Sequence, residues 1–224
     1  MQYRSRVARV ILFACITGMV ALSSLGAQAK TFRVLAATGT AAEVTIALQA
    51  GADFNASDFV GESALMDAAG RNRDPKVVQV ILGYGAVVDA RNGYGETALM
   101  YAAQYNQDPG VIAVLLQAGA NPRLRDVLGR TTVMHAAASN PVVEVLHALV
   151  QAGADVNARD EKGMTALMYA AWSNGNPAVV TALLSAGADG TAQSAAGRNA
   201  FEYGQSNPAL SGGQVLFALE AAAK

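Results

Sequence analysis

Cysteine and histidine are scarce in this chain, and neither positive nor negative charge predominates. Its 224 residues include 1 cysteine and 2 histidines, and 16 basic residues stand against 17 acidic ones. A single cysteine cannot form a disulfide within the chain, so apolar burial has to hold the fold together. The nearly balanced charge gives no support to binding of nucleic acid or of a membrane surface.

Sequence motifs of catalysis and metal binding are also missing. The chain has no Gly-x-Ser-x-Gly, no phosphate-binding glycine-rich loop with a lysine, and no His-Glu-x-x-His. His135 and His147 lack the converging ligands that a metal site needs, so we interpret each as a satisfied or solvated histidine. The sequence therefore predicts no catalytic residue, no cofactor and no metal, and we do not expect an enzyme.

The first 29 residues have the pattern of an export signal. Arg4, Arg6 and Arg9 precede an apolar run, and Ala27 to Ala29 has the small-x-small form of a signal-peptidase site. The run is short for a bilayer span of about 20 residues and is interrupted by polar residues, which argues against an uncleaved anchor. We predict a signal peptide at 1–29, cleaved after Ala29, that directs the chain to the periplasm, with an extracellular destination as the alternative.

Cleavage would change the composition of the chain. The segment at 1–29 contains Cys15 and three arginines but no acidic residue, so 13 basic and 17 acidic residues remain, a net charge of −4. We expect the mature chain to be soluble, without membrane association, and monomeric.

A short phrase that recurs at intervals of 34 residues organises the rest of the sequence. A fixed period of this length is typical of a solenoid, in which supersecondary units stack on their neighbours. The five copies of the phrase are Ser63-Ala64-Leu65-Met66, Thr97-Ala98-Leu99-Met100, Thr131-Thr132-Val133-Met134, Thr165-Ala166-Leu167-Met168 and the degenerate Asn199-Ala200-Phe201-Glu202.

Each 34-residue block predicts a turn followed by two helices. Asp58 with Gly61 suits a β-turn, and Thr97 suits the N-cap of a first helix that ends in paired alanines. An Asn-Pro or Asp-Pro pair then starts a second helix, which has an apolar stripe and ends at Gly-Ala. The predicted starts of these second helices are Asp74-Pro75, Asp108-Pro109, Asn140-Pro141 and Asn176-Pro177.

Together these features resemble the ankyrin repeat, which has a β-turn, two helices and the phrase T-P-L-H-x-A. Ala98 and Met100 replace the proline and histidine of that phrase. The resemblance implies an all-α repeat solenoid of helix-turn-helix pairs joined by β-turn tips, with two degenerate caps around four good repeats. We place the ankyrin-repeat domain at 30–224, with a cap at 31–57, repeats at 58–91, 92–125, 126–159 and 160–193, and a C-terminal cap at 194–224.

The resemblance also implies a concave groove that binds a protein partner, lined by the turn tips and by the first helices. Three of the five tips carry bulky apolar residues, which hints at an exposed patch. Tyrosine, tryptophan and arginine, which are enriched at interface hot spots, follow the paired alanines or precede the turns. The candidate partner-binding residues are Phe59, Val60, Arg71, Arg91, Tyr94, Tyr105, Arg125, Val127, Leu128, Arg159 and Trp172.

Two columns of equivalent residues allow more than one interpretation. The arginines at 91, 125 and 159 either contact a partner or pair with Asp160 and its equivalents. A second column packs between repeats or faces the groove, and packing is the favoured interpretation. Its members are Asp67, Tyr101, His135, Tyr169 and Tyr203.

We therefore expect a non-enzymatic protein–protein interaction module in the periplasm. One form of this function is an inhibitor or immunity protein of an exported enzyme or toxin. The alternatives are an accessory or scaffold protein for periplasmic stress defence and a secreted effector that acts on a host protein. The sequence indicates the binding face but not the identity of the partner.

Overall fold

The structure, a computed structural model, describes residues 32–211 and 213–224. The predicted signal peptide at 1–29, with Cys15, lies outside these residues. Within the described ranges there are isolated β-bridges but no named strand, and no helix is long and apolar enough to cross a membrane. Residues 32–38 are helical, and the helices that follow are α3 (Ala41–Gln49), α4 (Ala64–Arg71), α5 (Pro75–Gly83), α6 (Ala98–Tyr105), α7 (Pro109–Gln117), α8 (Thr132–Ser139), α9 (Val143–Gln151), α10 (Ala166–Ser173), α11 (Pro177–Ser185), α12 (Ala200–Gly204) and α13 (Gln214–Ala222).

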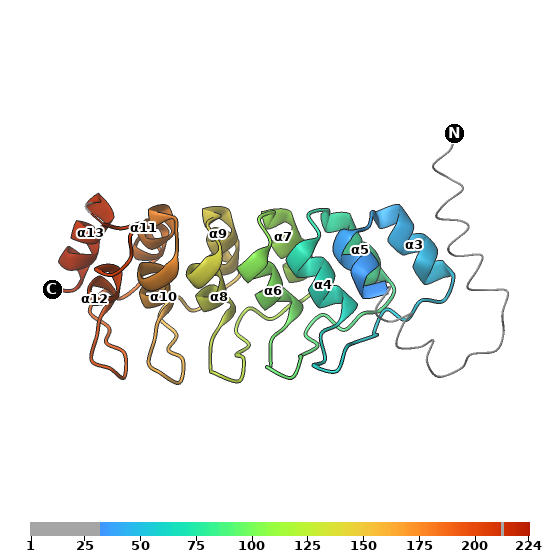
Figure 1. Cartoon of the computed structure of the whole chain (residues 1–224), viewed down its shortest axis with the longest axis horizontal. Helices are drawn as coiled ribbons and strands as arrows, with labels where there is room; N and C mark the ends of the chain where they lie inside the picture. Colours follow the sequence, from blue (N-terminus) through green and yellow to red (C-terminus); the bar gives the residue numbers. More distant parts are fainter. Residues whose placement is uncertain (1–31, 212) are drawn as a thin grey trace.

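The helices form two rows along an elongated stack (Figure 1). In the first row, α4, α6, α8, α10 and α12 pack one against the next. In the second row, α3, α5, α7, α9, α11 and α13 do the same. The loops that lead into the first-row helices project together along one edge (Figure 1). This is an all-α repeat solenoid, as the resemblance implies.

The first-row helices begin at the predicted serine and threonine caps. The side-chain oxygens of Ser63, Thr97 and Thr165 each accept a hydrogen bond from the backbone N–H three residues later. Such a bond satisfies one of the free N–H groups at the start of a helix. Thr131 occupies the same position before α8, but its buried hydroxyl finds no partner among the described residues.

The second-row helices begin as predicted in three of the four repeats. Asp74, Asp108 and Asn176 cap α5, α7 and α11, and a proline follows each cap. The prediction that Asn140-Pro141 starts the corresponding helix of the third repeat is wrong. There α9 begins two residues later, after Val142, which makes no side-chain cap bond. Asn140 lies two residues before the cap position, and its side chain donates hydrogen bonds to backbone carbonyls of the preceding repeat.

A buried asparagine follows each first-row helix from α4 to α12. The Nδ2 group of Asn106 donates to the carbonyls of Ala69 (2.8 Å) and Asn72 (2.7 Å) in the preceding repeat. Its Oδ1 accepts from the N–H of Asp108 at 2.9 Å. Each asparagine thereby ties its own loop to the loop before it. The asparagine ladder consists of Asn72, Asn106, Asn140, Asn174 and Asn207.

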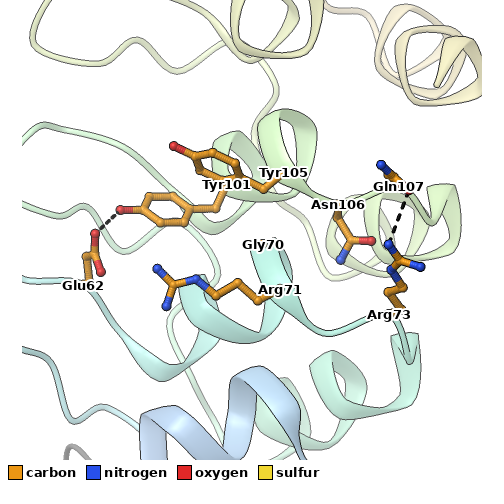
Figure 2. Close-up of a pocket in the computed structure, with 8 residues that line it drawn as sticks. All are labelled: Glu62, Gly70, Arg71, Arg73, Tyr101, Tyr105, Asn106 and Gln107. Atoms are coloured by element: carbon orange, nitrogen blue, oxygen red, sulfur yellow. Dashed lines mark hydrogen bonds between the residues drawn. The ribbon is translucent and has the colours of Figure 1, made fainter. Parts of the chain in front are cut away.

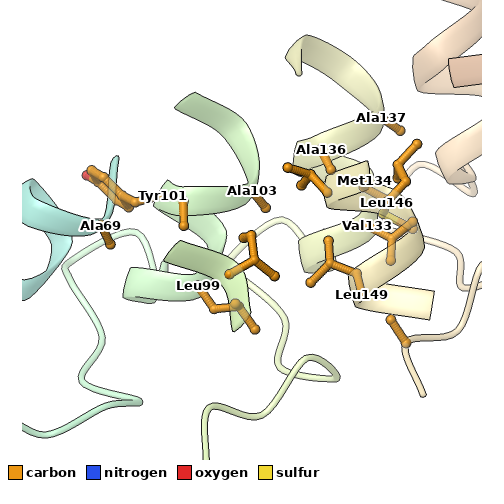
Figure 3. Close-up of a cluster of buried hydrophobic side chains, with 14 of the residues drawn as sticks. Ala69, Leu99, Tyr101, Ala103, Val133, Met134, Ala136, Ala137, Leu146 and Leu149 are labelled. Carbon is orange, nitrogen blue, oxygen red and sulfur yellow. The ribbon is translucent and has the colours of Figure 1, made fainter. Parts of the chain in front are cut away.

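The paired alanines let neighbouring first-row helices approach each other closely. All of those between α4 and α10 have 0% exposure. The second-row helices bury the predicted stripe, with Val77, Val78 and Ile81 fully buried and Leu82 half-buried. These side chains belong to one cluster of buried apolar residues, part of which, including Ala69 and Leu149, is drawn in Figure 3. Each repeat therefore buries its apolar face against the next, which is how a solenoid gains its stability.

The turns have the predicted form. The N–H of Gly95 donates to the carbonyl of Asn92 at 2.9 Å, and the Asn92 side chain accepts from two N–H groups within the turn. Gly95 has a φ of 75°, which a side chain would disfavour. A Cβ here would also lie 2.6 Å from the Arg91 guanidinium and 3.1 Å from the Val127 nitrogen. Glycine is needed because the next turn passes so close.

The two ends of the stack contain the expected helix pairs. Residues 32–38 and α3 form one pair, and α12 packs against α13 to form the other. The boundaries of the domain and of its repeats stay predictions.

Candidate functional site

Backbone hydrogen bonds join the turn tips into a continuous edge. The N–H of Gly93 donates to the carbonyl of Val60 at 2.6 Å, and the N–H of Val127 donates to that of Tyr94 at 2.9 Å. The same kind of bond links the later tips. Tip residues of successive repeats therefore lie side by side, and we call this line of residues the tip edge.

Apolar side chains are exposed along the first three tips. Phe59 is 100% exposed, and Tyr94, Val127 and Leu128 are between 46% and 56% exposed. Val60 is half-buried. The fourth tip carries a Glu-Lys pair instead. The exposure expected from the sequence is therefore present, and it is confined to one part of the tip edge.

Three further candidate residues lie at the ends of first-row helices. Tyr105 on α6 and Trp172 on α10 are 58% and 54% exposed. The Arg71 side chain on α4 is 62% exposed, and its Nη1 lies 2.8 Å from an oxygen of Asp67. We call the tip edge together with the exposed side of the first-row helices the groove face. The structure places Arg71, Tyr105 and Trp172 on three different helices of that face.

The arginine column has a structural role in two of its three members. Arg91 donates to the carbonyls of Gly95 (3.1 Å) and Arg125 (2.5 Å). Arg125 donates in the same way to the carbonyls of Gly129 and Arg159, both at 2.7 Å. Each guanidinium braces its own turn against the next one, and its partners are carbonyls, not the aspartate expected as an alternative. Arg159 is exposed.

The column that contains Tyr101 and Tyr169 packs inside the stack, as the favoured interpretation predicted. Tyr101 is 8% exposed, and its hydroxyl donates to Glu62 at 2.5 Å and accepts from Asn92 at 3.2 Å. The hydroxyl of Tyr169 donates to Asp160 at 2.7 Å. Burial and the adjacent carboxylate raise the pKa of each phenol well above its ordinary value, so both stay neutral donors.

His135, the member of this column in the third repeat, is also satisfied within the fold. Its Nε2 lies 3.0 Å from Asp126 and its Nδ1 lies 3.0 Å from the side-chain oxygen of Gln104. Arg130 donates to the same Asp126 oxygen at 2.7 Å. Burial alone would raise the pKa of Asp126, but the bonds from His135, from Arg130 and from backbone N–H groups outweigh it and hold that pKa far below its usual range.

Glu96, Asp126 and His135 come close enough together to resemble a set of metal ligands. One ligand atom from each lies within 4.8 Å of the others. The Arg130 guanidinium, however, also lies 3.8 Å from Glu96 and already supplies positive charge to this group of carboxylates. The arrangement is therefore explained without a metal ion, and we assign none. His147, in contrast, is exposed on α9.

The sequence did not predict a partly buried ion-pair cluster at the N-terminal end of the stack. Arg33 contacts Asp58 at 2.6 Å, Glu62 at 2.9 Å and Asp67 at 2.5 Å, and its side chain is only 13% exposed. In the later repeats, Tyr or His occupies the position of Asp67. The first repeat has a third carboxylate there, and the cap supplies the cation. Arg33 lies in a helix without the repeated phrase, so no periodic signal could point to it.

A pocket of about 510 Å³ opens on the groove face between α4 and α6 (Figure 2). Gly70, on α4, lines it without a side chain; a Cβ there would lie 3.4 Å from the Tyr101 ring and 3.6 Å from the Tyr105 ring, in ordinary van der Waals contact. Only Arg71 and Tyr105 among its lining residues were predicted from the sequence. The lining consists of Glu62, Gly70, Arg71, Arg73, Tyr101, Tyr105, Asn106 and Gln107.

Comparison with known families agrees with this architecture. A family model described as ankyrin repeats (3 copies) matches residues 33–126 and 106–194. Together these ranges include the tips and first-row helices that carry all of the candidate residues. A search of curated proteins found no match to the chain.

Proposed function

The chain belongs to the ankyrin-repeat family, and we propose that it binds another protein through its groove face. Ankyrin repeats are generally modules of protein–protein interaction. The observation that carries the proposal is the set of large exposed side chains that the groove face presents at Phe59, Tyr94, Leu128, Tyr105 and Trp172.

These side chains are suited to recognition in two respects. Aromatic residues contribute much contact area with few rotatable bonds, and they are enriched among the residues that dominate binding energy. The elements that carry them are held by the asparagine ladder and by the bonds along the tip edge, so little order has to be gained on binding. A preformed surface of this kind favours a folded protein partner.

We propose further that the protein is exported and acts in the periplasm. The basic, apolar and small-residue pattern of residues 1–29 supports export. N-terminal sequencing of the protein recovered from a periplasmic fraction should begin at Lys30. Recovery of the mature protein in the culture medium alone would instead favour a secreted effector.

The form of this function that we propose is inhibition of an exported enzyme or toxin. A rigid non-catalytic surface can block an active site by covering it. Purified protein added to the captured partner should abolish the activity of that partner in proportion to the amount of complex. If the partner remains fully active in the complex, an accessory or scaffold role in periplasmic stress defence replaces inhibition.

The binding proposal is tested with a variant that removes the exposed side chains. Tyr94, Tyr105, Leu128 and Trp172 are changed together to Ser, and proteins captured from periplasmic extract are identified by mass spectrometry. A matched control changes exposed apolar residues of the second row and its loops, with Ile46→Ser, Val87→Ser and Phe217→Ser. We expect the first variant to lose the partner and the control to retain it. Equal capture by both would show that the groove face is not the binding surface.

A further inference from the structure

We propose that the pocket between α4 and α6 receives an acidic, extended segment of the partner protein. This inference deepens the proposed function and rests on it. The segment would present carboxylates to Arg71 and Arg73 and an aromatic or apolar side chain to Tyr105.

The charges around the pocket are arranged so that cations face outward. Arg71 and Arg73 both line the pocket, and in the view of Figure 2 Arg71 lies beneath the two tyrosine rings and Arg73 to their right, with Asn106 between the two arginines. Both arginines are exposed. Arg71 uses part of its guanidinium on Asp67, and Arg73 makes a long bond of 3.4 Å to the side chain of Gln107. Since a guanidinium has five N–H donors in a planar fork, each arginine keeps donors for a carboxylate.

The acidic residues near the pocket do not cancel this attraction. Glu62, which lines the pocket, accepts from Tyr101 and from Arg33. The Asp67 side chain is only 4% exposed and pairs with Arg33 as well as with Arg71. Arg33 therefore compensates part of this negative charge from inside the stack, and Arg71 compensates a further part from outside. The most exposed charged groups of the lining are the guanidinium groups of Arg71 and Arg73, because the Glu62 side chain is only 24% exposed.

The pocket is large enough to receive side chains of a chain segment, and the protein-binding role proposed above favours such a segment over a small molecule. Its volume of about 510 Å³ falls within the range of about 300 to 1,000 Å³ that is usual for small-molecule sites. Gly70 lines it at a helical position where glycine costs about 0.5 to 1 kcal/mol relative to alanine. The equivalent residue in the next repeat is Gln104, so a side chain is compatible with the helix. The lack of one at position 70 leaves the space for the ligand.

The test uses the mature protein and two tripeptides, N-acetyl-Glu-Phe-Glu-amide and N-acetyl-Gln-Phe-Gln-amide. Binding is followed by nuclear magnetic resonance at the backbone amide of Gly70 and at the Nε–H groups of Arg71 and Arg73. We expect the acidic peptide to shift these signals with a millimolar dissociation constant, at least about ten-fold lower than that of the amide peptide, because charge-assisted bonds are lost in the latter.

Variants locate the effect in the pocket. Arg73→Gln should raise the dissociation constant of the acidic peptide several-fold. Lys76→Gln, which removes an exposed cation outside the pocket lining, should change that constant by less than two-fold. Gly70→Gln, which copies the next repeat, should fill the pocket and abolish the shifts while the helical circular dichroism spectrum stays unchanged.

Four results would overturn the proposal. The first is an absence of shifts at about 10 mM peptide, and the second is equal affinity for the two peptides. The third is an equal loss of affinity for the acidic peptide in Arg73→Gln and Lys76→Gln. The fourth is binding of inorganic phosphate, followed by the same signals, that is tighter than binding of the acidic peptide. The last of these would show a site for phosphate groups. If any of them occurs while the four-residue groove variant still loses the partner, the proposed function stands and only the acidic-segment proposal fails.

Discussion

Two positions of the repeat, only two residues apart, follow opposite rules. The asparagine ladder has the same residue in all of its places, with exposed fractions between 1% and 7%. The position two residues earlier in the first four repeats holds Gly70, Gln104, Ala138 and Trp172. A ladder side chain meets the backbone of the preceding repeat, which is the same each time. The earlier position borders the groove face and does not meet the same backbone partner in every repeat, so its side chain varies.

Breaking the ladder at its second place should have the largest effect on stability. Asn106→Ala removes two hydrogen bonds to buried carbonyls and one acceptor for the Asp108 N–H. Leaving these groups without partners should lower the free energy of unfolding by about 3 kcal/mol. Urea denaturation measures the loss, and Gln107→Ala, at the exposed adjacent residue, should change it by less than about 0.5 kcal/mol. Equal losses in the two variants would contradict the structural role of the ladder.

The same contrast explains which parts of the fold the sequence predicts. The turn glycines, the first-helix caps and the paired alanines recur every 34 residues because each meets the same neighbour in each repeat. The first four ladder asparagines recur just as regularly, but Asn140 precedes a proline, as a helix-capping residue does, so the sequence pattern places it in the wrong column. The structure separates the two roles because Asn140 bonds to the repeat before it.

The site is less predictable because its features do not recur. The period predicts where the tips and helix ends lie, and residues such as Tyr94 and Trp172 are exposed there as expected. The pocket is lined in part by Gly70, which has no side chain, and the charge balance around Glu62 depends on Arg33 in the irregular cap. Neither the absence of a side chain nor a contact from outside the repeats leaves a periodic trace.

The Arg33 cluster tests whether an irregular contact can matter as much as a repeated one. Arg33→Gln should lower the free energy of unfolding at pH 7 by about 2 kcal/mol, because three partly buried carboxylates lose their shared cation. Arg71→Gln, at the exposed partner of Asp67, should cost only about 0.5 kcal/mol. Thermal melting of both variants provides the comparison, and a larger loss for Arg71→Gln would refute the central role of Arg33.

The pH dependence of the Arg33→Gln variant follows from the direction of the Asp58 pKa. Burial alone would raise that pKa, but hydrogen bonds from Arg33 and from two backbone N–H groups outweigh it, so the folded value lies below the ordinary one. The stabilisation is therefore present above the unfolded pKa of about 4 and is lost as pH falls through the folded value. The difference between the melting temperatures of wild type and variant should therefore shrink progressively as pH falls below about 4.

The position of Asp126 is neither invariant, as the ladder asparagine is, nor freely variable, since the equivalent residues in the repeats are Asp, Asn or Ser. Asp126→Asn keeps a turn acceptor, as Asn92 has in the preceding repeat, but it loses the charge that faces Arg130 and His135. We expect a loss of about 1 kcal/mol at pH 7. Because the folded pKa of Asp126 is depressed, this loss should shrink as pH falls below about 4. A loss that stays constant down to pH 2 would contradict the charge argument.

The smallest effect on stability is expected where the groove face is altered. Trp172→Gln gives the fourth repeat the residue that the second has at Gln104, and it should change the free energy of unfolding by less than about 0.5 kcal/mol. Asn174→Ala, two residues further on, should cost about 3 kcal/mol because Asn174 belongs to the ladder. Partner capture at a temperature where both variants are folded should show the reverse order, with Trp172→Gln the weaker binder. If Trp172→Gln destabilises the protein as strongly as Asn174→Ala, the position of Trp172 also holds the stack together, and the two positions do not differ as argued.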